Sequence, residues 1–120
     1  MDADGHLVLA DFGLAKLGLN RSHKTYSFCG SHEYMAPEMV EEQGHGYMLD
    51  YYCLGALLYE LVVGFPPFYS HDKDKIFESI RHEEVGFPES VDLSHDIRWI
   101  IRDLLKKDPK ERLGSLHGVK

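Results

Sequence analysis

The run from Tyr51 to Val63 constrains the fold more than any other part of the sequence. It is apolar on nearly all sides of a helix, with Glu60 as its only charge, and such a helix is usually buried. Asp50 precedes it as a good N-cap, and Gly64 followed by two prolines ends it. We therefore predict a buried central helix over residues 50–63, wrapped by the other helices. The charges of Asp50 and Glu60 then need partners.

Weaker helical patterns accompany this run. Residues 38–42 predict a short helical turn with Pro37 at its start, a position that tolerates proline. Asp72 opens a helix that reaches about Arg81, and Ser94 caps another. The apolar residues of the Ser94 helix recur at helical spacing: they are Ile97, Ile100, Ile101, Leu104 and Leu105. With 120 residues and 43% hydrophobic content, the patterns predict a mainly α fold with a single core.

The first third of the chain has a different pattern. Asp4 and Gly5 form a turn dipeptide, and residues 6–9 have the composition of a short β-strand. No second strand precedes it, so we expect a hairpin remnant whose other half lies outside the chain. Residues 14–36 have no sustained period and predict a long loop. Loops of this length in compact domains are usually functional or disordered.

Composition narrows the choice of partner and compartment. The formal net charge of −7 at pH 7 argues against nucleic acid and favours a basic peptide. Cys29 and Cys53 form no paired motif, and the eight histidines lack zinc-ligand spacing. No signal peptide follows Met1, and the run 51–63 is shorter than the roughly 20 residues that span a bilayer. We expect an intracellular, cytoplasmic protein with no membrane span and no structural metal.

Short motifs in a fixed order carry the most specific signal. Residues 11–13 read Asp-Phe-Gly, residues 36–38 read Ala-Pro-Glu, and Asp50, Gly55 and Arg112 follow at larger distances. This order resembles the C-terminal lobe of a eukaryotic protein kinase. Longer segments resemble the AGC group of serine/threonine kinases: residues 25–38, 64–68 and 107–114.

The resemblance implies a domain layout. Residues 1–120 would be a partial kinase domain, with an activation segment at 11–38 and a helical subdomain at 39–120. Nothing in the chain resembles the Gly-rich loop, the strand lysine or the His-Arg-Asp catalytic loop. The N-terminal lobe and the catalytic base would therefore lie outside this chain.

The resemblance also assigns a metal and nucleotide role to residues 11–13. Asp11 would bind the Mg²⁺ that bridges the β- and γ-phosphates of ATP, because phosphoryl transfer needs a hard oxygen ligand there. Phe12 would pack against the missing lobe, and Gly13 would let the backbone turn. Without the other motifs, Asp11 reads as an exposed turn carboxylate.

Ser27 resembles the activation-loop phosphorylation site of the AGC group, with Thr25 as the second candidate. A phosphate adds nearly two negative charges and several acceptors, which order a loop where basic groups are near. The alternative is that both are ordinary loop hydroxyls. The resemblance implies an upstream activating kinase as a partner.

The substrate-binding positions implied by the resemblance are Ser31, Glu33, Tyr34 and Glu60. Ser31 replaces the usual threonine whose hydroxyl meets the catalytic aspartate. Glu60 would receive a substrate arginine upstream of the phosphoacceptor, since guanidinium and carboxylate pair well. The alternative for Glu60 is an internal pair. His32 reads as a surface loop histidine without a catalytic role.

The remaining implied roles are structural. Glu38 and Arg112 resemble an ion pair that ties the end of the activation segment to the lower helices. Asp50 resembles the residue that holds the catalytic loop in place by accepting hydrogen bonds from the backbone N–H groups of that loop.

The resemblance implies part of a serine/threonine kinase that transfers the ATP γ-phosphate to proteins with basic residues near the phosphoacceptor. By itself the chain should be inactive and marginally stable. The alternatives are a non-catalytic binding or scaffold module built on a kinase lobe, and a free-standing small protein that folds with a different partner.

Overall fold

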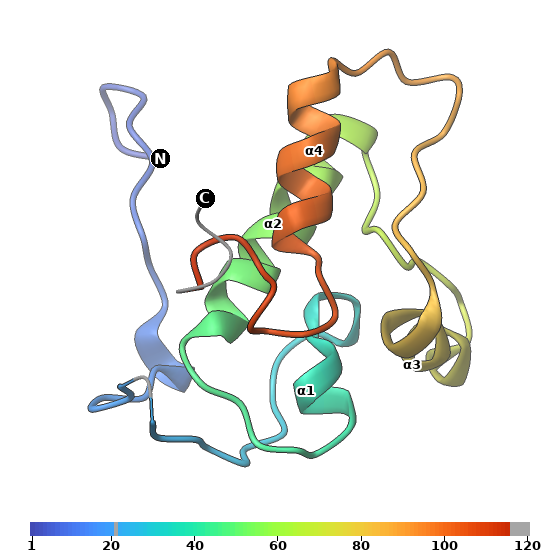
Figure 1. The fold of residues 1–120 in the computed structure, drawn as a ribbon. Coiled ribbons are helices and arrows are strands. Elements are labelled where there is room, and N and C mark those ends of the chain that lie inside the picture. The colour runs from blue at the N-terminus through green and yellow to red at the C-terminus, as the bar shows by residue number, and fades with distance from the viewer. Residues whose placement is uncertain (21, 116–120) are drawn as a thin grey trace.

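The computed structural model describes residues 1–20 and 22–115. Over these residues the fold is mainly helical (Figure 1). The α-helices are α1 (Pro37–Val40), α2 (Met48–Val63), α3 (Lys73–His82) and α4 (His95–Leu104), and the 3₁₀ turns are Phe12–Leu14 and His32–Tyr34. α1, α3 and α4 fall where the sequence predicts them.

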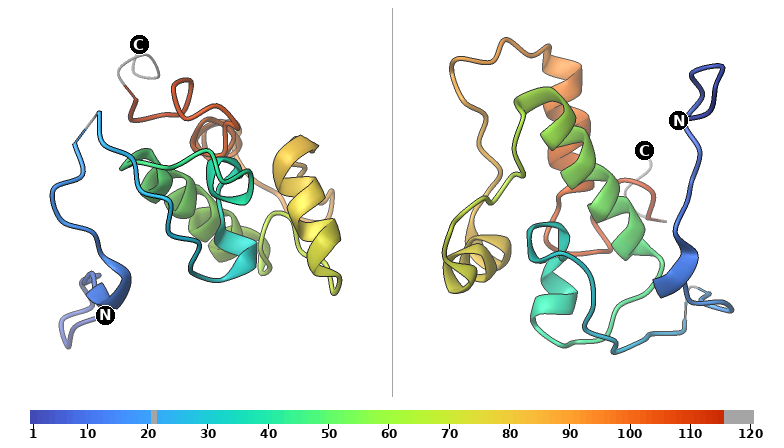
Figure 2. Two further views of the ribbon diagram at one scale, coloured as in Figure 1. Left: turned by 90° about the horizontal axis from the view of Figure 1, so that it is seen from below. Right: turned by 180° about the vertical axis from the view of Figure 1, so that it is seen from behind.

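Helix α2 is buried on one face, where α4 packs along it (Figures 1 and 2). Gly55 permits the close approach, because a Cβ atom there would lie 2.8 Å from Cβ of Leu104. The opposite face leaves Leu57 and Leu61 exposed, so the prediction of burial on nearly all sides is wrong.

None of the described helices combines the length and the apolar composition that a bilayer crossing requires.

The start of α2 also differs from the prediction. The helix begins at Met48 with Tyr47 at the N-cap, so Asp50 lies inside the first turn and is exposed. Asp50 is therefore not the cap, although a carboxylate in the first turn still interacts favourably with the helix dipole. Gly64 ends the helix in the left-handed conformation, with φ of 99°, as predicted.

The predicted caps of the other two long helices are confirmed. Asp72 accepts a hydrogen bond from the backbone N–H of Asp74 at 3.0 Å. Ser94 Oγ accepts one from the N–H of Ile97 at 3.3 Å. Such caps satisfy backbone donors that the first helical turn leaves open, which is why local sequence was enough to place both helix starts.

The predicted strand at residues 6–9 does not form. This stretch runs apart from the helices (Figure 2), and Leu7 is 90% exposed. A strand is stable only when its N–H and C=O groups pair with a neighbour. Within the described residues, the β-type pairing present is an isolated antiparallel bridge between Thr25 and His45.

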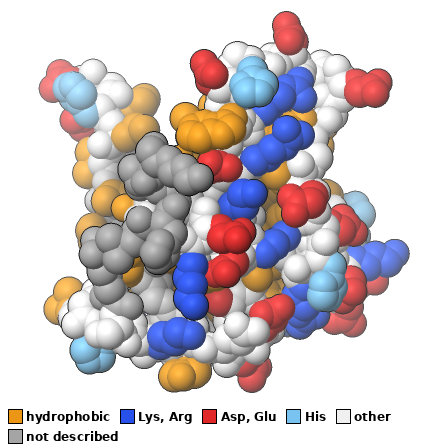
Figure 3. Space-filling model, in the orientation of Figure 1, with side chains coloured by type: hydrophobic (Ala, Val, Ile, Leu, Met, Phe, Trp, Pro, Cys, Tyr) orange, Lys and Arg blue, Asp and Glu red, His pale blue; other side chains and the backbone are white. Residues whose placement is uncertain are grey.

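Charges of both signs share the face drawn in Figure 3. Lys and Arg side chains alternate there with Asp and Glu side chains along α4 and the loop after it. This face therefore offers no continuous basic surface to a phosphate backbone.

Candidate functional site

The Asp11 carboxylate is exposed at the start of the first 3₁₀ turn. Asp11 has a left-handed backbone with φ of 62°, and its Oδ1 accepts a hydrogen bond from Gly13 N–H at 3.4 Å. Phe12 beside it is 70% exposed. Left-handed backbone is uncommon for a residue other than glycine, although Asp tolerates it better than most.

Asp11 offers a single exposed carboxylate as a possible metal ligand. The described residues contain no group of three or more His, Cys, Asp or Glu side chains that could hold an ion by themselves. Mg²⁺ often takes only one or two protein carboxylates together with substrate phosphates and water. The single Asp11 carboxylate is therefore compatible only with a metal site that other ligands complete.

Ser27 lies in an extended stretch that contacts the loop before α2. Thr25 N–H donates to His45 C=O at 2.8 Å, and His45 N–H donates back at 2.9 Å. The hydroxyl oxygens of Thr25 and Ser27 are 3.4 Å apart. Ser27 is half-buried and lines a cavity of about 220 Å³ together with Met39 and Glu42.

Among the predicted substrate residues, Tyr34 and Glu60 are brought together. The Tyr34 hydroxyl donates a hydrogen bond to the Glu60 carboxylate on α2. This bond, followed by burial, raises the pKa of Tyr34 to about 12. The partner of Glu60 is thus a neutral hydroxyl, and the negative charge of Glu60 is not cancelled by it. Ser31 is exposed just before the second 3₁₀ turn, and Glu33 lies half-buried within it.

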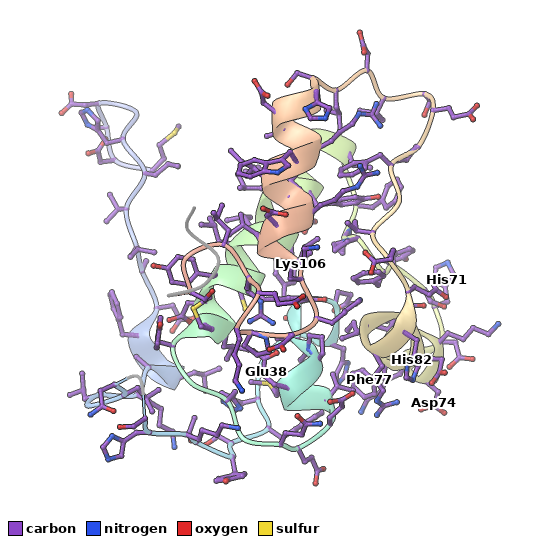
Figure 4. All side chains as sticks on the ribbon, in the orientation of Figure 1. Glu38, His71, Asp74, Phe77, His82 and Lys106 are labelled. Carbon is purple, nitrogen blue, oxygen red and sulfur yellow. The ribbon has the colours of Figure 1, made fainter. Side chains whose placement is uncertain are left out.

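Glu38 and Arg112 form a buried bidentate ion pair. Arg112 Nη1 and Nη2 lie 2.9 and 3.0 Å from the two Glu38 carboxylate oxygens, and the two side chains are 0% and 6% exposed. Arg112 also donates to Met48 C=O at 2.7 Å and to Lys106 C=O at 3.1 Å. Figure 4 shows Glu38 on α1 near the loop that carries Lys106. The pair therefore joins α1, the start of α2 and the loop after α4.

Asp50 and Asp11 stand apart from these pairs. Within the described residues, Asp50 makes no side-chain hydrogen bond, and the Asp11 side chain bonds only to the Gly13 N–H of its own turn. His45 and Cys53 were not predicted as site residues. His45 pairs through its backbone, so no side-chain pattern could signal it.

Cys53 contacts the predicted site from α2. Its thiol donates to Tyr34 C=O at 3.4 Å, and burial, followed by the nearby Asp50 charge, raises its pKa to about 11. The thiolate is the reactive form of cysteine. Cys53 should therefore be inert at neutral pH.

We expect Cys53 in a Cys29→Ser variant to react with a disulfide reagent at pH 8 about 100-fold more slowly when folded than when unfolded. The reason is that a pKa near 11 instead of the usual 8.5 or so lowers the thiolate fraction by more than about 100-fold. The same variant in urea is the control. Equal rates in the two states would contradict the burial of this thiol.

Known proteins resemble this chain over nearly all of its length. The whole chain, residues 1–120, matches the family model of the protein kinase domain. RAC-beta serine/threonine-protein kinase of Homo sapiens is 43% identical over 115 residues, which are 96% of this chain and 24% of that protein. Protein kinase C of Drosophila melanogaster is 42% identical over 114 residues, or 95% of this chain and 15% of that protein. The chain thus spans about a quarter or less of the length of these relatives. It belongs to the protein kinase family, and within that family to the AGC group of serine/threonine kinases.

Proposed function

We propose that this chain is the helical part of a kinase that transfers the γ-phosphate of ATP to serine or threonine in proteins. The observation that carries the proposal is the exposed Asp11 carboxylate, held by its own 3₁₀ turn at one end of segment 11–38. The buried pair of Glu38 and Arg112 anchors the other end. Residues 11–38 would then be the activation segment, and residues 39–120 the helical subdomain.

Asp11 would be the contribution of this chain to the nucleotide site. It would hold Mg²⁺ against the β- and γ-phosphates, with Phe12 and Gly13 shaping the same turn. A bound Mg²⁺ would supply charge neutralisation for the transferring phosphate. The sequence contains neither a Gly-rich loop nor a His-Arg-Asp motif, so we expect the chain by itself to be inactive.

Substrates with basic residues near the phosphoacceptor fit the charges of the site. Glu60 carries a negative charge whose partner is the neutral Tyr34 hydroxyl, which leaves it able to attract a guanidinium. Ser31 and Glu33 lie on the same segment as Tyr34. The net charge of −7 adds a general attraction for basic peptides.

Regulation would act through Ser27, with Thr25 as the second candidate. A separate upstream kinase would phosphorylate the segment, and the reaction would take place inside the cell, in the cytoplasm. Mass spectrometry of the active protein from its own cells tests this assignment. An unmodified Ser27 in that sample would contradict it.

The test of the activity uses the protein encoded by the complete open reading frame that contains this chain. We expect it to transfer ³²P from labelled ATP, with Mg²⁺, to a serine peptide with upstream arginines. The 120-residue chain serves as the control that should show no transfer. A complete protein without transfer to any basic peptide would instead support the non-catalytic binding or scaffold module.

A further inference from the structure

A cavity of about 690 Å³ lies at the start of α2. Its walls come from the segment that carries Lys24, from α1, from Arg81 near the end of α3 and from residues 107–110 after α4. In Figure 1 the loop after α4 passes above α1, with α3 to the side. The residues proposed to bind the nucleotide or the substrate do not line it. Its volume lies within the roughly 300–1,000 Å³ of typical small-molecule sites.

Positive side chains outnumber negative ones on the walls of this cavity. The cationic residues there are Lys24, Arg81, Lys107 and Lys110, and the carboxylates are Glu38, Glu41 and Asp108. The bidentate bond from Arg112 already neutralises Glu38. With histidine neutral, the other two carboxylates leave an excess of two positive charges, in a chain whose net charge is −7.

Lys107 holds a fixed position on the cavity wall. Its Nζ donates to Ile80 C=O at 2.7 Å and to Ser79 C=O at 3.3 Å, and it lies 4.1 Å from the centre of the Phe68 ring. Within the part of the chain that the structure describes, Lys107 forms no ion pair. Burial lowers the pKa of its amine to about 8. An anion in the cavity would therefore stabilise the charged form that burial disfavours.

Two further lysines on these walls also have no carboxylate partner. Lys24 Nζ donates to the C=O of Gln43 at 3.2 Å, and Lys110 is exposed. Neither forms an ion pair with a described residue. Both charges are therefore available to a ligand that enters the cavity.

We propose that this cavity binds a small molecule that carries a phosphate monoester, with Lys107, Arg81 and Lys110 as the groups that contact the phosphate. Such a group carries a charge of about −1.5 to −2 at pH 7, which matches the positive excess of the walls. Lysine and arginine are the side chains that recognise phosphate in proteins. The proposal goes beyond the proposed function, because it adds a second ligand site that takes no part in phosphoryl transfer.

Labelling with pyridoxal 5′-phosphate tests the site in the protein encoded by the complete open reading frame that contains this chain. The probe combines a phosphate monoester with an aldehyde. The aldehyde condenses with a neutral lysine amine and releases water, and borohydride then reduces the imine to a secondary amine. Mass spectrometry measures the labelled fraction of each lysine.

The phosphate of the probe should direct it to Lys107. Relative to pyridoxal, which lacks the phosphate, we expect labelling of Lys107 to rise about tenfold or more, because binding holds the aldehyde beside the amine. Lys106 is the matched control, since it is exposed and lies outside the cavity, and its ratio reports the intrinsic reactivity of the two probes. Equal ratios at Lys107 and Lys106 overturn the site.

A variant and a competitor complete the test. Lys110→Gln should lower labelling of Lys107 about two- to fivefold through the loss of one attraction, whereas Lys106→Gln should not; equal labelling in the two variants overturns the role of Lys110. Inorganic phosphate at about four times its Kd should lower labelling of Lys107 about fivefold, whereas sodium chloride at the same ionic strength should not. Competition by succinate but not by phosphate overturns the choice of a phosphate ligand. These readings need no kinase activity, so their failure stays separate from failure of the proposed function.

Discussion

Replacing Arg112 with alanine should lower the free energy of unfolding by about 3–5 kcal/mol, as expected when one partner of a buried ion pair is removed. The change leaves the Glu38 carboxylate buried without a charged partner. This side chain is 6% exposed and loses both of its hydrogen bonds to the guanidinium. It also removes the donor that serves Met48 C=O at 2.7 Å. Thermal unfolding followed by circular dichroism should show a midpoint lower by about 10 °C or more.

Two variants show whether the loss comes from the ion pair. Arg102→Ala is the control, because Arg102 is exposed and contacts the Phe87 ring at 5.2 Å, a contact that contributes only about 0.5–1 kcal/mol. Adding Glu38→Gln to Arg112→Ala should recover part of the lost stability, since the stranded charge is gone. An unchanged melting midpoint in Arg112→Ala would contradict a buried pair.

Local signals in the sequence predicted the helix starts at Asp72 and Ser94, because a cap bonds to its own first turn. The same reasoning was wrong at Asp50. The helix that contains Asp50 begins at Met48. The Arg112 guanidinium donates a hydrogen bond to the Met48 carbonyl. This contact comes from a residue far along the chain, and a local pattern cannot reveal it.

Long-range pairing explains the other differences. The β-favouring residues 6–9 do not form a strand, because a strand depends on a neighbouring strand and not on its own composition. The bridge between Thr25 and His45 joins two backbones, so side-chain patterns gave no sign of it. The pair of Glu38 and Arg112 was expected only from the resemblance to kinases, since no periodicity connects positions so far apart.

The charge of Glu60 separates two hypotheses that the sequence left open. In the kinase proposed to contain this chain, Glu60→Gln should lower kcat/KM for a peptide with an upstream arginine by about 10- to 150-fold. This range corresponds to about 1.5–3 kcal/mol for a hydrogen bond to a charged group. The reason is that, among the described residues, Glu60 accepts a hydrogen bond from the Tyr34 hydroxyl and forms no ion pair with a cation.

A peptide with alanine in place of that arginine completes a double-mutant cycle, which isolates the contact between Glu60 and the arginine. Wild type and Glu60→Gln should then phosphorylate the alanine peptide at similar rates, because the lost interaction needs both partners. Glu89→Gln changes an exposed glutamate outside the site and should leave both peptides unaffected. If Glu60→Gln slows both peptides equally, Glu60 acts through Tyr34 and the shape of the segment. Tyr34→Phe is a second test of the same two roles. It keeps the charge of Glu60 but removes the hydrogen bond that orients the carboxylate. Its effect on kcat/KM should therefore be smaller than that of Glu60→Gln and should fall mainly on KM.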